Sequence, residues 1–157
     1  MLRMRHAARA VVLDPADRIL LVRFEFPSRT VWGTPGGGVE EGETHETAIV
    51  RELEEEAGLV GCELGPWIWT REHVFPFENG LWDGQIERFV LVRTAAFEPA
   101  PTFTAEQLAS EFVTGMRWWT PEELAATDAK FAPRRLPELV AALLRDGAPG
   151  EAVDVGV

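Results

Sequence analysis

Apolar residues along the chain gather in short runs separated by turn-forming residues. Branched and aromatic side chains dominate five of these runs, at residues 8–13, 19–24, 67–75, 86–94 and 113–119. Such composition between turn signals predicts β-strands. The segment Asp14-Pro15-Ala16-Asp17 joins the first two runs, so we expect them to pair as a hairpin. Residues 27–34 read as a loop, and residues 36–38, all glycine, as backbone that bends or closely approaches another group.

A helical pattern follows the glycine-rich segment. Its apolar residues fall on one stripe, at positions 48, 49, 53 and 57, which predicts an amphipathic helix. Thr44 suits the N-cap of this helix and Gly58 the position that ends it. Two further helices are predicted, one over residues 121–126 and one from residue 133 or 135 to residue 144.

Strands and helices alternate along the 157 residues without repeats or a linker. This order predicts the α/β class, with a mixed sheet covered by helices on its faces. A chain of this length fits a single domain, which we place at residues 1–145. Residues 146–157 are expected to form a flexible C-terminal tail.

Composition narrows the range of partners. The chain has 26 acidic and 15 basic residues and a formal net charge of −11, which disfavours binding to nucleic acid or to an anionic membrane. The single cysteine, Cys62, excludes an internal disulfide and a cysteine-based zinc cluster. A single cysteine fits a reducing cytoplasm. The chain contains no apolar run of about 18 residues, the length that would predict a membrane span. We therefore expect a cytoplasmic protein.

Three glutamates of the predicted helix carry the strongest chemical signal. Glu52, Glu55 and Glu56 are spaced i, i+3 and i+4, so they share one helical face. Like charges in this arrangement repel one another. They either remain in water or hold a cation between them, and carboxylates are ligands that Mg²⁺ prefers. The glycine-rich segment just before the helix favours the cation, although a hydrated acidic surface is the ordinary alternative for a glutamate-rich helix.

A longer pattern surrounds these glutamates. Its fixed positions are Gly37, Glu43, Arg51-Glu52-Leu53, Glu55-Glu56 and Gly58-Leu59. With this spacing the chain closely resembles the Nudix hydrolase family of MutT-like proteins. The segments Trp32-Gly33-Thr34-Pro35 and 117–124 resemble what family members carry elsewhere. The resemblance implies a Nudix-like α/β/α sandwich with a mixed central sheet. It also implies a pyrophosphatase that uses Mg²⁺ or Mn²⁺ to hydrolyse a nucleoside diphosphate linked to another moiety, by attack of water on phosphorus.

The resemblance also implies roles for single residues. Metal ligands would be Glu52, Glu55 and Glu56 with a main-chain carbonyl near Gly36 or Gly37. The structural motif would comprise Gly37, Gly58 and a Glu43–Arg51 pair that fixes the angle between loop and helix. The general base stays open between Glu55 or Glu56 on the helix and Glu111 or Glu106 further along the chain, with Glu111 preferred over Glu106.

Contacts to the rest of the substrate are less constrained by the sequence. Flat bases need stacking partners and phosphates need positive charge, and the candidates are Arg23, Trp32, Arg71, Phe75 and Arg88. The expected partner is a nucleoside diphosphate derivative, a small molecule. The oligomeric state is open, a homodimer included. Two alternatives remain: a sensor domain that binds the nucleotide without cleaving it, and an exposed helix that binds divalent ions or an acidic partner.

Overall fold

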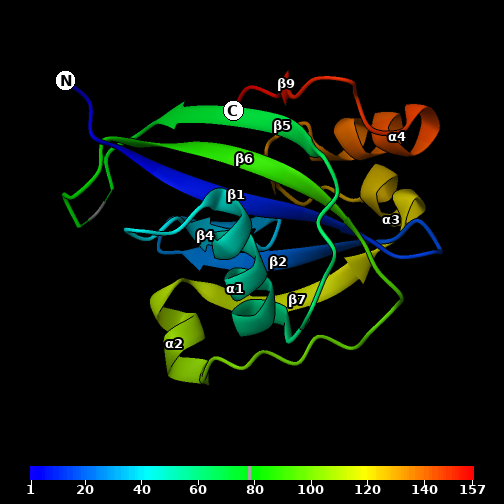
Figure 1. Ribbon diagram of the computed structural model, residues 1–157, viewed down its shortest axis with the longest axis horizontal. Coiled ribbons are helices and arrows are strands. Elements are labelled where there is room, and N and C mark those ends of the chain that lie inside the picture. Colours follow the sequence, from blue (N-terminus) through cyan, green and yellow to red (C-terminus); the bar gives the residue numbers. More distant parts are fainter. Residues whose placement is uncertain (78) are drawn as a thin grey trace.

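One curled mixed sheet forms the centre of this protein, whose computed structural model describes residues 1–77 and 79–157 (Figure 1). The strands of the described residues are β1 (Met4–Leu13), β2 (Ile19–Phe26), β3 (Arg29–Gly33), β4 (Gly36–Gly38), β5 (Trp67–Val74), β6 (Gly84–Arg93), β7 (Val113–Trp119), β8 (Phe131–Ala132) and β9 (Val153–Asp154). The helices are α1 (His45–Ala57), α2 (Ala105–Ser110), α3 (Pro121–Ala126) and α4 (Leu136–Asp146).

The order of the strands places the glycine-rich segment beside β1. The main path of the sheet runs β8-β3-β2-β1-β6-β5-β9, while β4 pairs with β1 and β7 pairs with β2. β1 and β6 are parallel over ten residue pairs. β1 and β2 meet only at Leu13 and Ile19, so the predicted hairpin is short. Beyond it the strands diverge, and β4 pairs with β1 from Ala7 to Arg9.

Alternation along the strands builds a hydrophobic layer on each face of the sheet. Even-numbered residues of β1, such as Ala8, Ala10 and Val12, pack with α1. Odd-numbered residues, such as Val11 and Leu13, pack with the layer that includes residues of α3 and α4. Figure 1 shows α1 on one side of the sheet and α3 and α4 together near its other end. The expected α/β/α arrangement is confirmed by this layering, because each layer has its own core.

Two expectations from the sequence are corrected by the structure. The segment expected to be a loop contains β3, which pairs antiparallel with β2 from Val22–Gly33 to Phe26–Arg29. The segment expected to be a flexible tail is docked, since β9 pairs with β5 and Val155 is only 4% exposed. In both cases short-range composition signals a loop, but pairing with a distant strand fixes the backbone.

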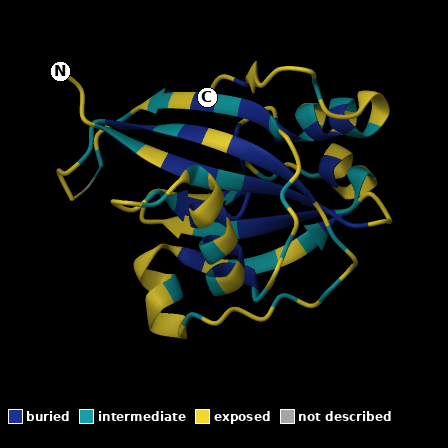
Figure 2. Ribbon diagram, in the orientation of Figure 1, coloured by how far each residue is buried: buried dark blue, intermediate teal, exposed yellow. Residues whose placement is uncertain are grey.

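Helix α2 was not expected from the sequence. Thr104 caps it by accepting a hydrogen bond from the backbone N–H of Gln107, and none of its residues is buried (Figure 2). Without an apolar stripe, its sequence carries little helical signal. Among the described residues, no helix is both long and apolar enough to cross a membrane.

Candidate functional site

Caps at both ends fix the position of α1. Thr44 and Thr47 form a reciprocal capping box at the N-terminus. Gly58 follows the last turn in the left-handed conformation, with φ of 73°, and its N–H donates to the carbonyl of Glu54. Such caps satisfy backbone groups that would otherwise lack partners at the helix ends. The rotation of the helix, and so the direction of its glutamates, is therefore set locally.

The glycines of β4 allow this helix to lie against the sheet. A Cβ atom on Gly37 would lie 2.5 Å from Oε1 of Glu52, and one on Gly36 would lie 2.1 Å from the carbonyl oxygen of Ala8. No side chain fits at either position without displacing its neighbours. The N–H of Gly36 donates to Oε1 of Glu56 at 3.0 Å. The glycine-rich segment thus forms a short strand that the acidic face of α1 closely approaches.

Three carboxylates meet where α1, β4 and the end of α2 converge. Oxygens of Glu52, Glu56 and Glu111 all lie within 4.8 Å of one another. Glu52 is 3% exposed and Glu56 is 1% exposed, and Oε2 of each is buried without a hydrogen-bond partner among the described residues. Burial, together with the neighbouring Glu52 carboxylate, raises the pKa of Glu56 well above its usual value. Buried carboxylates with free oxygens fit a hard divalent cation, which would supply the missing counter-charge.

Arg51 connects the loop to the helix. Its Nε and one terminal nitrogen donate to the two carboxylate oxygens of Glu43, at 2.8 and 3.0 Å, which is the pair that the family resemblance implied. The same arginine donates to the carbonyl of Gly38 at 3.2 Å and to Glu52 at 3.1 Å. The hydrogen bonds that Arg51 donates to Glu43 raise the pKa of Arg51, although burial opposes this shift. Arg51 therefore braces one of the clustered carboxylates from outside the cluster.

Glu55 lies differently from its two neighbours. Its Oε2 accepts a hydrogen bond from Arg51 at 3.0 Å, because the two residues are spaced i and i+4 on the helix. The three glutamates of the motif therefore do not all converge on one point in this structure. Glu111 completes the close group in place of Glu55, and Oε1 of Glu55 is left without a hydrogen bond among the described residues. Burial raises the pKa of Glu55, and the Arg51 charge counteracts this.

A loop bound to the end of α1 brings Glu111 to the cluster. The N–H of Ala100 donates to the carbonyl of Ala57 at 2.9 Å, and those of Thr102 and Phe103 donate to the carbonyl of Glu55 at 3.0 and 3.1 Å. This loop leads into α2, whose C-cap residue is Glu111. Partial desolvation raises the pKa of Glu111, and the charge of Glu52 adds to the effect. Glu106, the other loop candidate, lies outside the carboxylate group.

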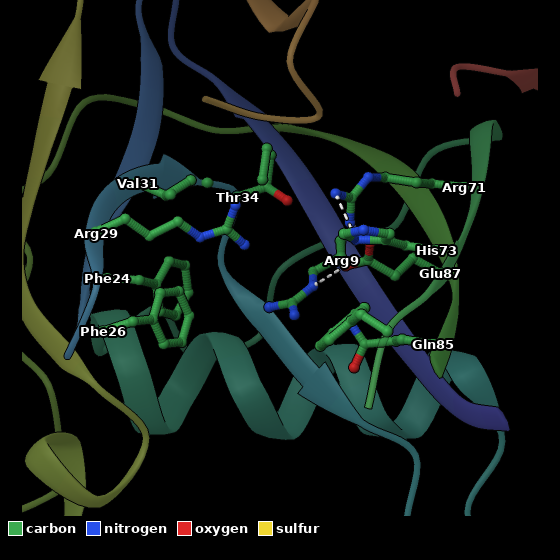
Figure 3. A pocket seen from close by; sticks show the side chains of 13 residues that line it. Arg9, Phe24, Phe26, Arg29, Val31, Thr34, Arg71, His73, Gln85 and Glu87 are labelled. Atoms are coloured by element: carbon green, nitrogen blue, oxygen red, sulfur yellow. Dashed lines mark hydrogen bonds and ion pairs between the residues drawn. The ribbon is translucent and has the colours of Figure 1, made fainter. Parts of the chain in front are cut away.

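A pocket opens next to the carboxylates, on the opposite face of the sheet from α1 (Figure 3). It is lined by Arg9, Phe24, Phe26, Arg29, Val31, Gly33, Thr34, Arg71, His73, Phe75, Gln85, Glu87 and Ala132. Arg9 links it to the cluster, because its guanidinium donates to the carbonyl of Gly36 at 2.9 Å while the N–H of Gly36 binds Glu56. A single residue of β4, Gly36, thus connects Arg9 of the pocket with Glu56 of the carboxylate group.

The pocket contains two of the five residues expected to contact substrate, Arg71 and Phe75. The other three lie elsewhere. Arg23 hydrogen-bonds to Oγ1 of Thr114 at 2.9 Å. The Trp32 ring packs edge-on against Trp119, with centroids 5.2 Å apart, and Arg88 is exposed on β6.

Sequence reasoning missed Arg9 and Glu87, which lie at the centre of this pocket. Arg9 interrupts the apolar run of residues 8–13, whereas Glu87 lies beside Arg88 in β6. Glu87 is buried, the Arg9 side chain is 14% exposed, and the two charges pair at 2.7 Å. For Arg9, a charged residue inside an apolar run was the available signal. Such a residue does not by itself identify its ion-pair partner. Arg9 and Glu87 are 78 positions apart and meet only through the parallel pairing of β1 and β6.

Comparisons with known proteins agree with this geometry. The chain is 29% identical to Nudix hydrolase 25 of Arabidopsis thaliana over 126 residues, 73% of this chain and 71% of that protein. It is 40% identical to the RNA pyrophosphohydrolase of Sulfurovum sp. over 75 residues, 41% of this chain and 45% of that protein. The alignment thus spans less than half the length of that second relative.

A solved structure shows the same fold. The MutT NUDIX hydrolase from Burkholderia pseudomallei superposes with a TM-score of 0.64 at 24% identity, covering 86% of this chain and 95% of that one. The hydrolase and pyrophosphohydrolase relatives support the expected pyrophosphatase-type enzyme. The family model described as NUDIX domain matches residues 3–140, and the chain therefore belongs to the NUDIX domain family.

Proposed function

We propose that this protein hydrolyses a nucleoside diphosphate linked to another moiety, with Mg²⁺ or Mn²⁺ as cofactor. The observation that carries the proposal is the pair of buried carboxylates, Glu52 and Glu56, whose Oε2 atoms have no hydrogen-bond partner among the described residues. Burying one oxygen of each carboxylate without a partner costs free energy. Both carboxylates lie beside the exposed carboxylate of Glu111. A cation and a phosphorylated substrate bound at this place would account for the arrangement.

Glu52 and Glu56 are the residues that would hold the metal ion, joined by the free Oε1 of Glu55 and by backbone oxygens of β4. When bound, a divalent ion neutralises the diphosphate, increases the electrophilicity of phosphorus and acidifies water. Arg51 keeps Glu52 in place through the hydrogen bond at 3.1 Å. It also leaves Glu55 one oxygen for other partners, since only Oε2 is bound to the arginine.

Glu111 is the residue that we assign as general base. It lies beside the two buried carboxylates but is itself exposed, so substrate and water can reach it. In the proposed step the oxygen of water forms a bond to phosphorus, the bond from that phosphorus to the bridging oxygen breaks, and the second phosphate leaves with the electron pair. The carboxylate of Glu111 accepts the proton of the water.

The exposed-helix alternative fits the structure poorly, because Glu52 and Glu56 are 3% and 1% exposed. A partner protein cannot reach side chains at that depth. The sensor alternative keeps the same binding site and differs only in whether the bond is cleaved.

The test is a panel of nucleoside triphosphates, nucleotide sugars, ADP-ribose and dinucleoside polyphosphates, assayed with Mg²⁺ and with Mn²⁺. We expect cleavage of at least one compound and its loss in Glu56→Gln. Glu54→Gln is the matched control, because Glu54 lies on the same helix but is exposed and outside the cluster. Binding of nucleotide and metal without any cleavage would support the sensor function instead.

The Glu111→Gln variant tests whether Glu111 is a general base or a metal ligand. We expect it to lower kcat about 10²-fold or more, which is typical for loss of a general base, while Mn²⁺ binding measured by calorimetry changes little. Loss of Mn²⁺ binding in this variant would instead make Glu111 a metal ligand.

We also propose a cytoplasmic location, which the single free cysteine, Cys62, supports. Detection of the native protein outside the cytoplasmic fraction of its cell would contradict it.

A further inference from the structure

The pocket beside the carboxylate cluster is small and positively charged, in contrast to the chain as a whole. Its volume is about 110 Å³, below the roughly 300–1,000 Å³ that encloses a drug-sized ligand, so it can hold one moiety of a larger substrate. Three arginines and one glutamate line it, although the chain carries a net charge of −11. Because it adjoins the cluster through Gly36, a substrate whose phosphates lie at the carboxylates can place its other end here.

The inner wall of the pocket is an ion triad, in which Glu87 and Arg71 are buried and the Arg9 side chain is 14% exposed. Glu87 accepts a hydrogen bond from Arg9 at 2.7 Å and from Nη1 of Arg71 at 2.5 Å. Each oxygen of Glu87 thereby accepts a hydrogen bond from an arginine, so its charge is compensated within the triad. The triad leaves one positive charge in excess, and it holds both guanidinium groups in fixed orientations.

Arg71 retains donors that no protein group uses. It is 8% exposed, and its Nε is buried without a hydrogen-bond partner among the described residues. Its Nη2 lies on the same edge of the guanidinium as the Nε–H and carries two hydrogens, so it retains a donor beside its 3.4 Å contact with Nδ1 of His73. Two parallel donors therefore remain on one edge of Arg71. This edge has no acceptor, so it matches two hydrogen-bond acceptors that lie side by side.

Thr34 faces the same space. It is 2% exposed, and its Oγ1 is also buried and unpartnered within the described part of the chain. Figure 3 shows the hydroxyl pointing into the pocket toward the group formed by Arg9, Arg71 and His73. Two buried residues with unused polar atoms at one end of a pocket favour a polar ligand atom between them, because buried polar groups normally find partners.

Aromatic rings form the sides of the pocket. The rings of Phe24 and Phe26 are nearly parallel, with an interplanar angle of 10° and centroids 6.2 Å apart. His73 and Phe75 have centroids 4.5 Å apart, and Figure 3 shows Phe24 and Phe26 across the pocket from His73. Flat apolar sides suit a planar heterocycle, which can stack on them. A phosphate group would use the arginines but would gain nothing from the rings.

We propose that this pocket binds the nucleobase of the substrate and selects a base whose inner edge carries two adjacent acceptors, guanine or hypoxanthine, over adenine. The proposal rests on the proposed function for the identity of the substrate class. Guanine presents O6 and N7 as acceptors, and arginine binds this pair through two parallel hydrogen bonds. Adenine presents an amino group at the same place, so a donor would face the donors of Arg71. Thr34 adds an O–H that can turn toward O6.

The test compares GTP and ITP with ATP as substrates, and GMP and IMP with AMP as ligands in calorimetry. We expect GTP and ITP to have about tenfold or higher kcat/KM than ATP, and the monophosphates to differ similarly in Kd, since one such base contact contributes a factor of about 5 to 150. ITP and IMP lack the 2-amino group of guanine, so their agreement with GTP and GMP assigns the preference to the O6 and N7 edge.

Single substitutions show whether Arg71 and Thr34 determine the base preference. Arg71→Gln is expected to reverse it toward adenine, because glutamine can pair with both the amino group and N7. Thr34→Val is nearly isosteric and is expected to weaken GMP binding severalfold. Arg93→Gln, which removes an exposed arginine outside the pocket, is the control for charge. If Arg71→Gln does not fold, Thr34→Val and the wild-type comparison still decide.

Calorimetry with the monophosphates distinguishes the base preference from hydrolysis. Tighter binding of GMP and IMP without cleavage of any diphosphate would support the base preference and refute the hydrolase. Equal or tighter binding of AMP would overturn the base preference even if hydrolysis occurs. Competition between inorganic phosphate and GMP, with no preference among bases, would overturn it in favour of a phosphate site.

Discussion

Replacing Gly58 by alanine tests how the end of α1 holds the loop that carries Glu111. Gly58 has a φ of 73°, and a Cβ atom there would lie 2.1 Å from the carbonyl oxygen of Ala100. The alanine variant is therefore destabilised in two ways. Its backbone adopts the left-handed conformation, and its methyl group displaces the loop. Gly61 is a matched control, because it has a similar φ of 68° but nothing within 4 Å of an added Cβ.

The contacts of Gly58 set the expected loss in the free energy of unfolding. The left-handed conformation costs a non-glycine residue about 1 kcal/mol, and both variants bear this cost. Only Gly58→Ala also threatens the hydrogen bonds from Ala100 to Ala57 and from Thr102 and Phe103 to Glu55. At about 1 kcal/mol each, loss of two of them gives a total of about 3 kcal/mol, against about 1 kcal/mol for Gly61→Ala.

Thermal unfolding monitored by circular dichroism measures the difference. For a protein of this size about 3 °C of Tm corresponds to 1 kcal/mol, so we expect Tm to fall by about 9 °C in Gly58→Ala and by about 3 °C in Gly61→Ala. The displaced loop also moves Glu111, so kcat of any confirmed substrate should fall only in Gly58→Ala. Equal losses of Tm in the two variants would refute the reasoning, because the contact with Ala100 would then contribute nothing.

Two further predictions concern the buried charges. Arg51→Lys cannot reproduce the paired hydrogen bonds to Glu43, and we expect it to lower Mn²⁺ affinity about tenfold or more; unchanged affinity in calorimetry would show that the pair does not position the ligands. Glu87→Gln leaves the buried Arg71 and the mostly buried Arg9 without the carboxylate that pairs with both and should destabilise the protein by about 3–5 kcal/mol at pH 7. Burial alone would raise the pKa of Glu87, but Arg9 and Arg71 outweigh it and lower the pKa. The stabilisation by this carboxylate is therefore present above its unfolded pKa of about 4.3 and is lost as the pH falls through the lower folded value. Urea unfolding at pH 7 and near pH 3 should show the difference between wild type and Glu87→Gln shrinking; a constant difference would contradict the assignment.

The sequence by itself determined the elements whose signals are local. The apolar stripe of α1 and the caps at Thr44 and Gly58 depend on residues within a few positions of one another, so the helix was predicted with nearly its observed limits. The family resemblance rests on the same short segment. The resemblance also implied the pair of Glu43 and Arg51, which lie close in the sequence because loop and helix are contiguous in the chain.

Only the tertiary structure decided what fills the site around that segment. Glu111 reaches the cluster because a loop some 45 residues beyond α1 in the sequence binds the end of that helix, and no local pattern encodes that contact. The pocket forms in the same way, since β1, β6 and β5 bring Arg9, Glu87 and Arg71 together from distant segments. Periodicity shows which face of a strand a side chain occupies, but pairing and register determine its neighbours. The chemistry of the glutamates was therefore readable in the chain, whereas the completion of their cluster and the shape of the adjoining pocket depend on the folded sheet.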